Sequence, residues 1–346
     1  AINHHRTPER YGYPPAGLHN PTFSKRIRGV ACSPVLGPAG EPDEAPAMAL
    51  NELRQLIDRH ARPDMTTPID GVLIARHDVS ALESSMSGSV MALIVQGRKR
   101  LALGDQVHEY GAGDYLVSSL DLPVTGQFID ASPAHPALGF GLLLQPASIA
   151  ELLLQAGAAE LRDGRGSPPA SMLVSQASAQ LLDAVRRLLR LLDSPRDIPI
   201  LAPFVRREIL WLLLGGEQGA AIRQLGLADS NLSHIARAVR WIRQHYDRAF
   251  RVEDVAGICG MSASAFYRNF HAATAMSPIQ FQKQIRLQEA RLLLAAQTGD
   301  VAAIGYRVGY DSPSQFSREY RRQFGVPPSL DALRLRGTAP ALAALA

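Results

Sequence analysis

The 346-residue chain has few cysteines, few tryptophans and no long apolar run. Its two cysteines, Cys32 and Cys259, lie far apart, which excludes a disulfide framework and a zinc site built from several thiolates. No run of about 18 apolar residues occurs, so a membrane-spanning helix is not expected. The first residues lack the basic start and apolar core of a secretion signal, and a cytoplasmic location is therefore expected.

The length and composition are those of a globular chain with two domains. Apolar residues make up 46% and charged residues 20%, close to the average for folded proteins. Basic residues gather near the C-terminus: residues 231–346 hold 15 Lys or Arg against 8 Asp or Glu, whereas residues 1–230 hold 21 against 24. A basic module beside a mildly acidic one is typical of a nucleic-acid binder that carries a sensor.

The N-terminal part predicts β-structure between helices. Residues 1–47, rich in Pro and Gly, predict a flexible arm, and a short amphipathic helix is expected over residues 50–60. Short β-branched or aliphatic runs separated by glycine turns then predict an antiparallel barrel or sandwich. These runs are residues 72–75, 90–95, 98–103, 115–119, 124–129 and 137–144. Their Val, Leu, Ile and Phe content predicts a mostly apolar pocket inside the barrel.

Helical periodicity follows the strands, over residues 147–155, 175–192 and 199–214. The middle helix carries an apolar stripe of Leu181, Val185, Leu188 and Leu192, which suits packing of one helix on another. One interpretation is that the stripe covers the barrel within the same chain. The other is a homodimer interface, which is the expectation adopted here.

An internal repeat with a period of about 50 residues occupies the C-terminal part. Each copy predicts a short helix, a tight turn at Gly260 or Gly309, and a second helix, which together form a helix-turn-helix. At offset 50, Ser264 matches Ser314, Phe266 matches Phe316 and Arg268 matches Arg318.

The second helix of each copy is the candidate recognition helix. It begins at Ser262 or Ser312, whose hydroxyl can cap the first turn. Aromatic pairs four positions apart, such as Phe266 with Phe270, are expected to pack inward. The side chains left on the outer faces suit the edges of bases in the major groove: Ser264, Tyr267, Arg268, Ser314, Gln315, Ser317 and Arg318. Four further basic residues are expected to contact phosphates: Lys283, Arg286, Arg321 and Arg322.

A helix over residues 278–296 is predicted between the two copies. Its 19 residues span roughly 28 Å, close to the roughly 34 Å repeat of the major groove. Both recognition helices are therefore expected to reach successive grooves, with a bend in the DNA taking up the shortfall.

The repeat resembles the double helix-turn-helix domain of the AraC/XylS family of bacterial transcription regulators. The second copy, residues 305–328, reads GYRVGYDSPSQFSREYRRQFGVPP and matches the family signature nearly throughout. Two positions depart from the family pattern: Gly305 replaces an alanine, and Ala275 replaces the glycine that usually ends the first recognition helix. The resemblance implies sequence-specific binding to double-stranded promoter DNA.

The N-terminal part is similar to the cupin-type sensor of one AraC subfamily, through residues 95–100 (VQGRKR), 110–116 (YGAGDYL) and 121–125 (DLPVT). The resemblance implies an α+β chain with a cupin-like β-barrel and flanking helices, followed by an all-α DNA-binding domain. The expected boundaries are 48–215 for the sensor and dimerisation domain, 216–230 for a linker, 231–337 for the double helix-turn-helix and 338–346 for a tail. Expected partners are promoter DNA, a second copy of the chain, a small effector or a protein signal, and RNA polymerase for an activator, without a membrane or a cofactor.

The alternative hypothesis is a metal-dependent cupin enzyme fused to a DNA-binding module. His77, His108 and His135 fall on different predicted strands or loops and lack the close spacing of metal ligands. No nucleophile elbow, P-loop or dinucleotide-binding motif occurs in a strand-turn-helix setting. The sequence therefore predicts a regulator with no catalytic residues and no metal site.

Overall fold

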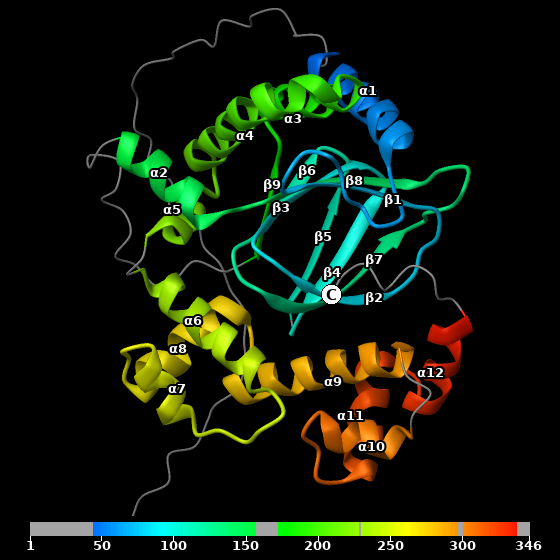
Figure 1. The fold of residues 1–346 in the computed structure, drawn as a ribbon, viewed down its shortest axis with the longest axis vertical. Helices are drawn as coiled ribbons and strands as arrows, with labels where there is room; N and C mark the ends of the chain where they lie inside the picture. The colour runs from blue at the N-terminus through cyan, green and yellow to red at the C-terminus, as the bar shows by residue number, and fades with distance from the viewer. Residues whose placement is uncertain (1–43, 105, 157–171, 228–229, 297–299, 338–346) are drawn as a thin grey trace, which may run out of the picture. The chain divides into compact units, whose positions relative to one another are not determined.

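A computed structural model describes residues 44–104, 106–156, 172–227, 230–296 and 300–337 of the chain (Figure 1). The chain divides into two units, 1–42 and 43–346, and the described residues belong to the second. Residues 1–43 of the predicted arm (1–47) and the whole predicted tail (338–346) thus lie outside the described residues. No helix within the described ranges is long and apolar enough to cross a membrane.

Two antiparallel sheets form the N-terminal β-structure (Figure 1). The five-stranded sheet has the order β1-β8-β3-β6-β9, and the four-stranded sheet has the order β2-β7-β4-β5. Their bounds are Val72–His77 (β1), Glu83–Ser87 (β2), Val90–Gln96 (β3), Arg98–Leu103 (β4), Gln106–Gly111 (β5), Asp114–Ser118 (β6), Leu122–Ile129 (β7), Ala137–Leu143 (β8) and Met172–Gln176 (β9). The six predicted strands are confirmed within a few residues at each end, whereas β2, β5 and β9 were not predicted.

Helices cover one face of the five-stranded sheet (Figure 1). They are α1 (Glu44–His60), α3 (Ala179–Arg190) and α4 (Ile198–Gly215), with α2 (Pro146–Ala156) and α5 (Gly219–Gly226) packed beside α4. Two short 3-10 turns, Leu191–Asp193 and Pro195–Asp197, join α3 to α4. Helix α5 lies inside residues 216–230, which were predicted to be a linker, so that segment is partly helical.

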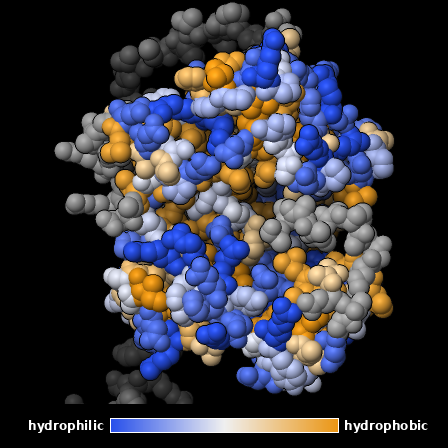
Figure 2. All heavy atoms as spheres, viewed as in Figure 1, coloured by the Kyte–Doolittle hydropathy of each residue, from blue (hydrophilic) through white to orange (hydrophobic). Residues whose placement is uncertain are grey.

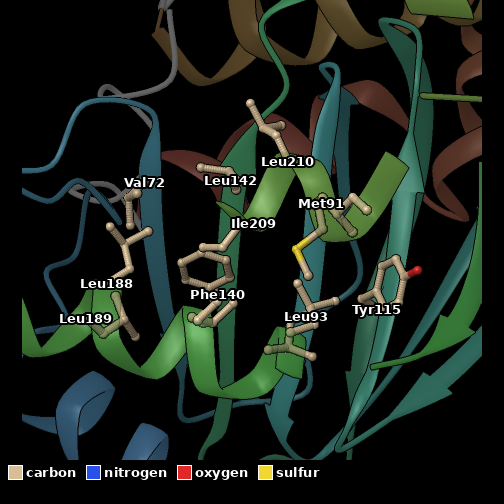
Figure 3. Close-up of a cluster of buried hydrophobic side chains, with 14 of the residues drawn as sticks. Val72, Met91, Leu93, Tyr115, Phe140, Leu142, Leu188, Leu189, Ile209 and Leu210 are labelled. Carbon is tan, nitrogen blue, oxygen red and sulfur yellow. The ribbon is translucent and has the colours of Figure 1, made fainter. Parts of the chain in front are cut away.

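The apolar stripe of α3 lies inside the chain rather than on its surface. Figure 3 shows Leu188 and Leu189 of α3 on one side of Phe140 of β8 and Leu93 of β3 on the other, all within one buried cluster. The exposed fractions of the stripe residues Leu181, Val185, Leu188 and Leu192 are 3%, 0%, 0% and 6%. The prediction that this stripe forms a dimer interface is therefore wrong, because the sheet and the neighbouring helices already bury it.

The opposite face of the five-stranded sheet packs against the four-stranded sheet. Side chains of both sheets fill the space between them: Ile94, Leu101, Leu103, Tyr110, Leu116, Leu122, Val124, Phe128 and Ala137. A mostly apolar pocket was predicted inside the barrel, but the hollow found in this part of the structure is small and partly polar. The hollow between these strands has a volume of only about 20 Å³, and His77, Glu83, Ser85, Lys99 and Gln127 are among its lining residues.

The interior of the sandwich continues into the first helices of the C-terminal region. One buried cluster contains sandwich residues such as Leu101 and Val124 together with Ile235 and Phe270 of the helical region. At the same junction Arg243 donates a hydrogen bond to Asp121 Oδ2, with an N to O distance of 2.6 Å. The sandwich and the first helices therefore share one hydrophobic core.

We predict that Leu188→Ala lowers the free energy of unfolding by about 2–5 kcal/mol, because it removes a fully buried side chain from the core under α3. Chemical denaturation followed by circular dichroism measures this change. Gln180→Ala, on the exposed surface of the same helix, is the matched control and should change stability by less than about 0.5 kcal/mol. Equal stabilities for the two variants would contradict the internal packing of the stripe.

Candidate nucleic-acid interface

The first helix-turn-helix is built from α6 (Asn231–Gln244), α7 (Val252–Ile258) and α8 (Ala263–Thr274). The turn between α7 and α8 passes through Gly260, whose φ is 67°. Helix α8 begins where predicted, because Ser262 Oγ accepts a hydrogen bond from the backbone N–H of Ala265 at 3.3 Å. Phe266 and Phe270 are fully buried, with their ring centroids 5.3 Å apart.

The second copy repeats α7 and α8 with α10 (Val301–Arg307) and α11 (Pro313–Phe324), and α12 (Pro328–Gly337) follows them. Ser312 Oγ accepts from the N–H of Gln315 at 3.4 Å, and Pro313 occupies the first helical position. Phe316 and Tyr320 lie on the inner face of α11 and are fully buried. The predicted starts and buried faces of both recognition helices are thus confirmed.

The outer faces of α8 and α11 carry the predicted base-reading residues. Five of them are exposed: Ser264, Tyr267, Arg268, Ser314 and Arg318. Gln315 and Ser317 are partly buried, and the amide of Gln315 donates to Glu319 Oε1 at 3.3 Å on the same helix. Arg321 and Arg322, predicted to contact phosphates, are also exposed on α11. In the view of Figure 2, hydrophilic residues cover much of the region of α6 and α8, interrupted by small apolar patches.

Helix α9 (Pro278–Ala296) connects the two copies and packs against both. Its first half contributes Phe281 and Ile285 to the core shared with the sandwich, and its second half contributes Leu287, Ala290 and Leu294 to a separate core under α10 and α11. The helix is thereby fixed to the first copy at one end and to the second copy at the other.

Arg286 joins the two copies, and this differs from the predicted contact with phosphate. Its Nε donates to the carbonyl of Tyr246, which follows α6, at 2.6 Å. Its Nη1 donates to the carbonyl of Gly309, in the turn of the second copy, at 2.7 Å. Burial lowers the pKa of this guanidinium. The prediction that Arg286 contacts DNA is therefore wrong: the side chain is half-buried and satisfies backbone carbonyls inside the protein.

Lys283 is also engaged within the protein. Its Nζ lies 3.0 Å from Glu319 Oε1 of α11, although the lysine side chain remains 40% exposed. Tyr310 donates to the other carboxylate oxygen of Glu319 at 2.9 Å. Burial opposes ionisation of Glu319, but the hydrogen bonds from Lys283, Gln315 and Tyr310 outweigh it and lower the pKa of this carboxyl group.

Sequence reasoning missed the polar contacts that hold α9 in place. Gln288 donates through Nε2 to the carbonyl of Ser85 in β2, at 3.1 Å, and Gln282 donates to the carbonyl of Tyr246 at 3.0 Å. Farther along, the carboxylate of Asp331 accepts from Arg291 and from the hydroxyl of Tyr320. The 278–296 periodicity located the helix, but it gave no signal for these partners, which come from distant segments.

The two departures from the family pattern have local explanations. A Cβ atom at Gly305 would lie 2.9 Å from Cδ1 of Phe316, so glycine lets α10 approach the ring of α11 closely. Ala275 ends α8 in the left-handed conformation, with φ of 55°, where Gly325 ends α11 with φ of 76°. The alanine therefore adopts the backbone geometry of the glycine that it replaces.

The histidines considered as metal ligands lie on different elements. The ring of His77 on β1 is tilted against Phe128, His108 lies on β5, and His135 belongs to the turn before β8. Within the ranges described above, no group of three or more His, Cys, Asp or Glu side chains is placed to hold a metal ion.

Comparison with known families identifies both parts of the chain. Residues 68–221 match the family described as "AraC-type transcriptional regulator N-terminus", and residues 255–330 match "Helix-turn-helix domain". Similar proteins include the transcriptional activator RhaS of Escherichia fergusonii, 27% identical over 149 residues, which are 42% of this chain and 52% of RhaS. The transcriptional regulator ExsA of Pseudomonas aeruginosa is 27% identical over 165 residues, which are 48% of this chain and 59% of ExsA. The chain thus spans about half the length of the curated relatives that it matches.

The fold also has a solved counterpart. The structure of ToxT from Vibrio cholerae superimposes with a TM-score of 0.50 and 12% identity, covering 76% of this chain and 98% of ToxT. At this identity the similarity concerns the fold alone.

We predict that Arg286→Ala lowers the free energy of unfolding by about 1–3 kcal/mol, because it leaves two inward-facing carbonyls without a donor. Urea denaturation of the full chain measures the loss. Arg322→Ala serves as control, since this exposed arginine should change stability by less than about 0.5 kcal/mol. An Arg286→Ala protein of normal stability that binds DNA poorly would restore the contact with phosphate.

Proposed function

This chain belongs to the AraC family of transcriptional regulators, and from that premise we propose that it binds double-stranded promoter DNA through α8 and α11. The observation that supports this most directly is the pair of capped helices whose outer faces carry exposed Arg, Ser and Tyr side chains. Helix α9 holds them as a rigid pair. In this proposal Arg268 and Arg318 read bases, together with Ser264, Tyr267, Ser314, Gln315 and Ser317.

Contacts with phosphate are assigned to the exposed Arg321 and Arg322, which lie in the last turn of α11. Lys283 is assigned a further contact with phosphate, although its ammonium also pairs with Glu319. The proposed location is the cytoplasm, because bacterial promoter DNA lies there. If the protein is an activator, RNA polymerase is a further partner.

The sandwich domain serves in this proposal as a sensor and not as an enzyme. The domain boundaries suggested by sequence, with the sensor ending near residue 215 and the DNA-binding domain beginning near 231, place α5 at the junction. The shared core and the contact between Arg243 and Asp121 join the two parts directly. A small effector or a protein signal received by the sandwich would therefore act on helices that touch it.

We predict that Arg318→Ala weakens binding to a selected DNA site by about 1–3 kcal/mol and leaves binding to a scrambled duplex nearly unchanged, because the residue contacts base edges. The site is first obtained by selection from random duplexes, and binding is then titrated at several salt concentrations. Arg321→Ala is the matched control: it should weaken both duplexes alike and reduce the salt slope by about one. Equal losses on both duplexes for Arg318→Ala would show that this residue does not read sequence.

A homodimer remains part of the proposal, but its interface is now assigned to α4 because the stripe on α3 is buried within the chain. Ile200, Phe204 and Trp211 lie along one side of α4 and are 65%, 69% and 46% exposed. Figure 2 shows apolar surface over the end of the molecule that carries α1, α3 and α4. The charged neighbours on α4 already pair within the chain, Arg207 with Glu151 and Glu208 with Arg187, so no unpaired charge opposes contact with a second α4.

We predict that Phe204→Glu converts a dimer into a monomer, because two copies would bring the introduced carboxylates into an apolar contact. Sedimentation velocity at micromolar concentration measures the change. Val107→Glu, at an apolar residue of β5 that is 62% exposed, should leave the dimer intact. A monomeric wild-type protein, or a dimer unaffected by Phe204→Glu, would rule out this interface.

A further inference from the structure

The carboxylate of Glu319 joins three side chains where α9 meets the second recognition helix. Lys283 Nζ of α9 lies 3.0 Å from Glu319 Oε1, and the hydroxyl of Tyr310 donates to Oε2 at 2.9 Å. The third partner is Gln315, one turn earlier on α11, whose Nε2 donates to Oε1 at 3.3 Å. The side chain of Glu319 is only 14% exposed. These partners hold the carboxylate in place, and the carboxylate in turn holds the amide of Gln315.

The contact with Glu319 decides which end of the Gln315 amide is left for a ligand. The donors around Glu319 lower its pKa, so the group is an ionised carboxylate at neutral pH. An ionised carboxylate only accepts hydrogen bonds, and the NH₂ group of Gln315 must therefore face it. Within the described part of the chain no residue donates to Gln315 Oε1, and this oxygen is not a buried atom without a partner. Gln315 thus presents an unused acceptor at the surface of α11.

The same sequence pattern is used differently at the start of α9. Ser277 and Gln280 form a reciprocal capping box there: the N–H of Gln280 donates to Ser277 Oγ at 3.2 Å, and the N–H of Ser277 donates to Gln280 Oε1 at 2.9 Å. Ser312 and Gln315 have the same spacing, and the N–H of Gln315 donates to Ser312 Oγ at 3.4 Å. The return bond to the Gln315 side chain is not formed, because that side chain turns to Glu319. Glu319 therefore keeps the amide oxygen of Gln315 out of a capping box.

The first recognition helix carries no such pair. At offset 50, Gln315 corresponds to Ala265 and Glu319 corresponds to Asn269. Alanine has no polar side-chain group, and the Asn269 amide lies 3.8 Å from the sulfur of Met261. The arrangement is thus confined to α11, and its effect is expected in one half of the DNA site.

From these contacts we propose that Glu319 is a positioning residue, which directs the carbonyl oxygen of Gln315 into the major groove to accept from the amino group of a base. This inference rests on the proposed binding of α11 to DNA. Adenine and cytosine present an amino group in the major groove, whereas guanine and thymine present acceptors there. Adenine N7 also accepts the remaining amide hydrogen of Gln315, so adenine is the expected base on the contacted strand.

Selection from random duplexes by the full chain tests this role. We expect the wild type to enrich adenine at one position, which Gln315→Ala identifies by losing the preference there. The preference is then measured as the ratio of affinities for two duplexes that differ at that base pair. Glu319→Ala should lower this ratio about tenfold, because the released amide of Gln315 bonds back to the N–H of Ser312. In a Gln315→Ala background the same substitution should add nothing.

Two conservative variants separate positioning from a general effect on α11. Glu319→Gln should keep the preference, because the ammonium of Lys283 requires an oxygen at the place of Oε1, and that oxygen still accepts from Gln315. Tyr310→Phe removes a different bond to the same carboxylate and should also keep it. If Glu319→Ala does not fold, the isosteric Glu319→Gln remains decisive, since a lost preference in that variant contradicts the proposal.

The possible failures of this inference and of the proposed function are distinguishable. A preference that survives Glu319→Ala, or that falls equally at every position of the site, overturns the positioning role. Enrichment of guanine or thymine at the Gln315 position, or no effect of Gln315→Ala at any position, does the same. In each of these cases a wild type that selects a defined site leaves the proposed function intact. A wild type that enriches no site overturns the proposed function, and the inference with it.

Discussion

The structure depends on a hydrophobic core that does not stop at a domain boundary. Side chains between the two sheets, such as Leu103 and Val124, belong to the same buried cluster as Ile235 of α6 and Phe270 of α8. Separating the sandwich from the first helix-turn-helix would expose this apolar surface to water, which is unfavourable in proportion to its area. The second helix-turn-helix has a core of its own, built around Phe316 and Tyr320, and depends on the rest of the chain mainly through α9. The first recognition helix is thus positioned by the sandwich, and the second is positioned by α9.

The features that sequence predicted are those encoded by neighbouring residues. Ser262 and Ser312 mark helix starts because a serine hydroxyl caps the turn that follows it, and the aromatic pairs of α8 and α11 face inward because residues four apart share a helix face. Strands β3, β4 and β7 were found from runs of aliphatic residues. Strand β2 (ESSMS) and strand β5 (QVHEYG) were missed because they are the two edge strands of the four-stranded sheet, and their polar residues give no period of two in hydrophobicity.

The errors concern partners that come from far along the chain. The stripe of α3 correctly indicated a buried face, but a sequence period does not distinguish a sheet of the same chain from a second subunit. Arg286 has the charge expected of a residue that contacts phosphate, yet it bonds to carbonyls of Tyr246 and Gly309, residues far from it in sequence. Lys99 and Phe128 likewise become neighbours only through the pairing of β4 with β7.

Gly104, in the tight turn after β4, is a residue through which the sandwich approaches the end of α8 closely enough to exclude a side chain. Gly104 has φ of 59°, and a Cβ atom there would lie 2.7 Å from the carbonyl oxygen of Ala275. Asparagine tolerates such a backbone conformation, but its side chain would not fit against that carbonyl. In an alignment of related chains, glycine at this position is compatible with a sandwich that touches the end of the first recognition helix, whereas asparagine keeps the turn and requires the two parts to stand apart. An asparagine at this turn would therefore identify, from sequence alone, a relative whose sandwich does not touch the first recognition helix in this way.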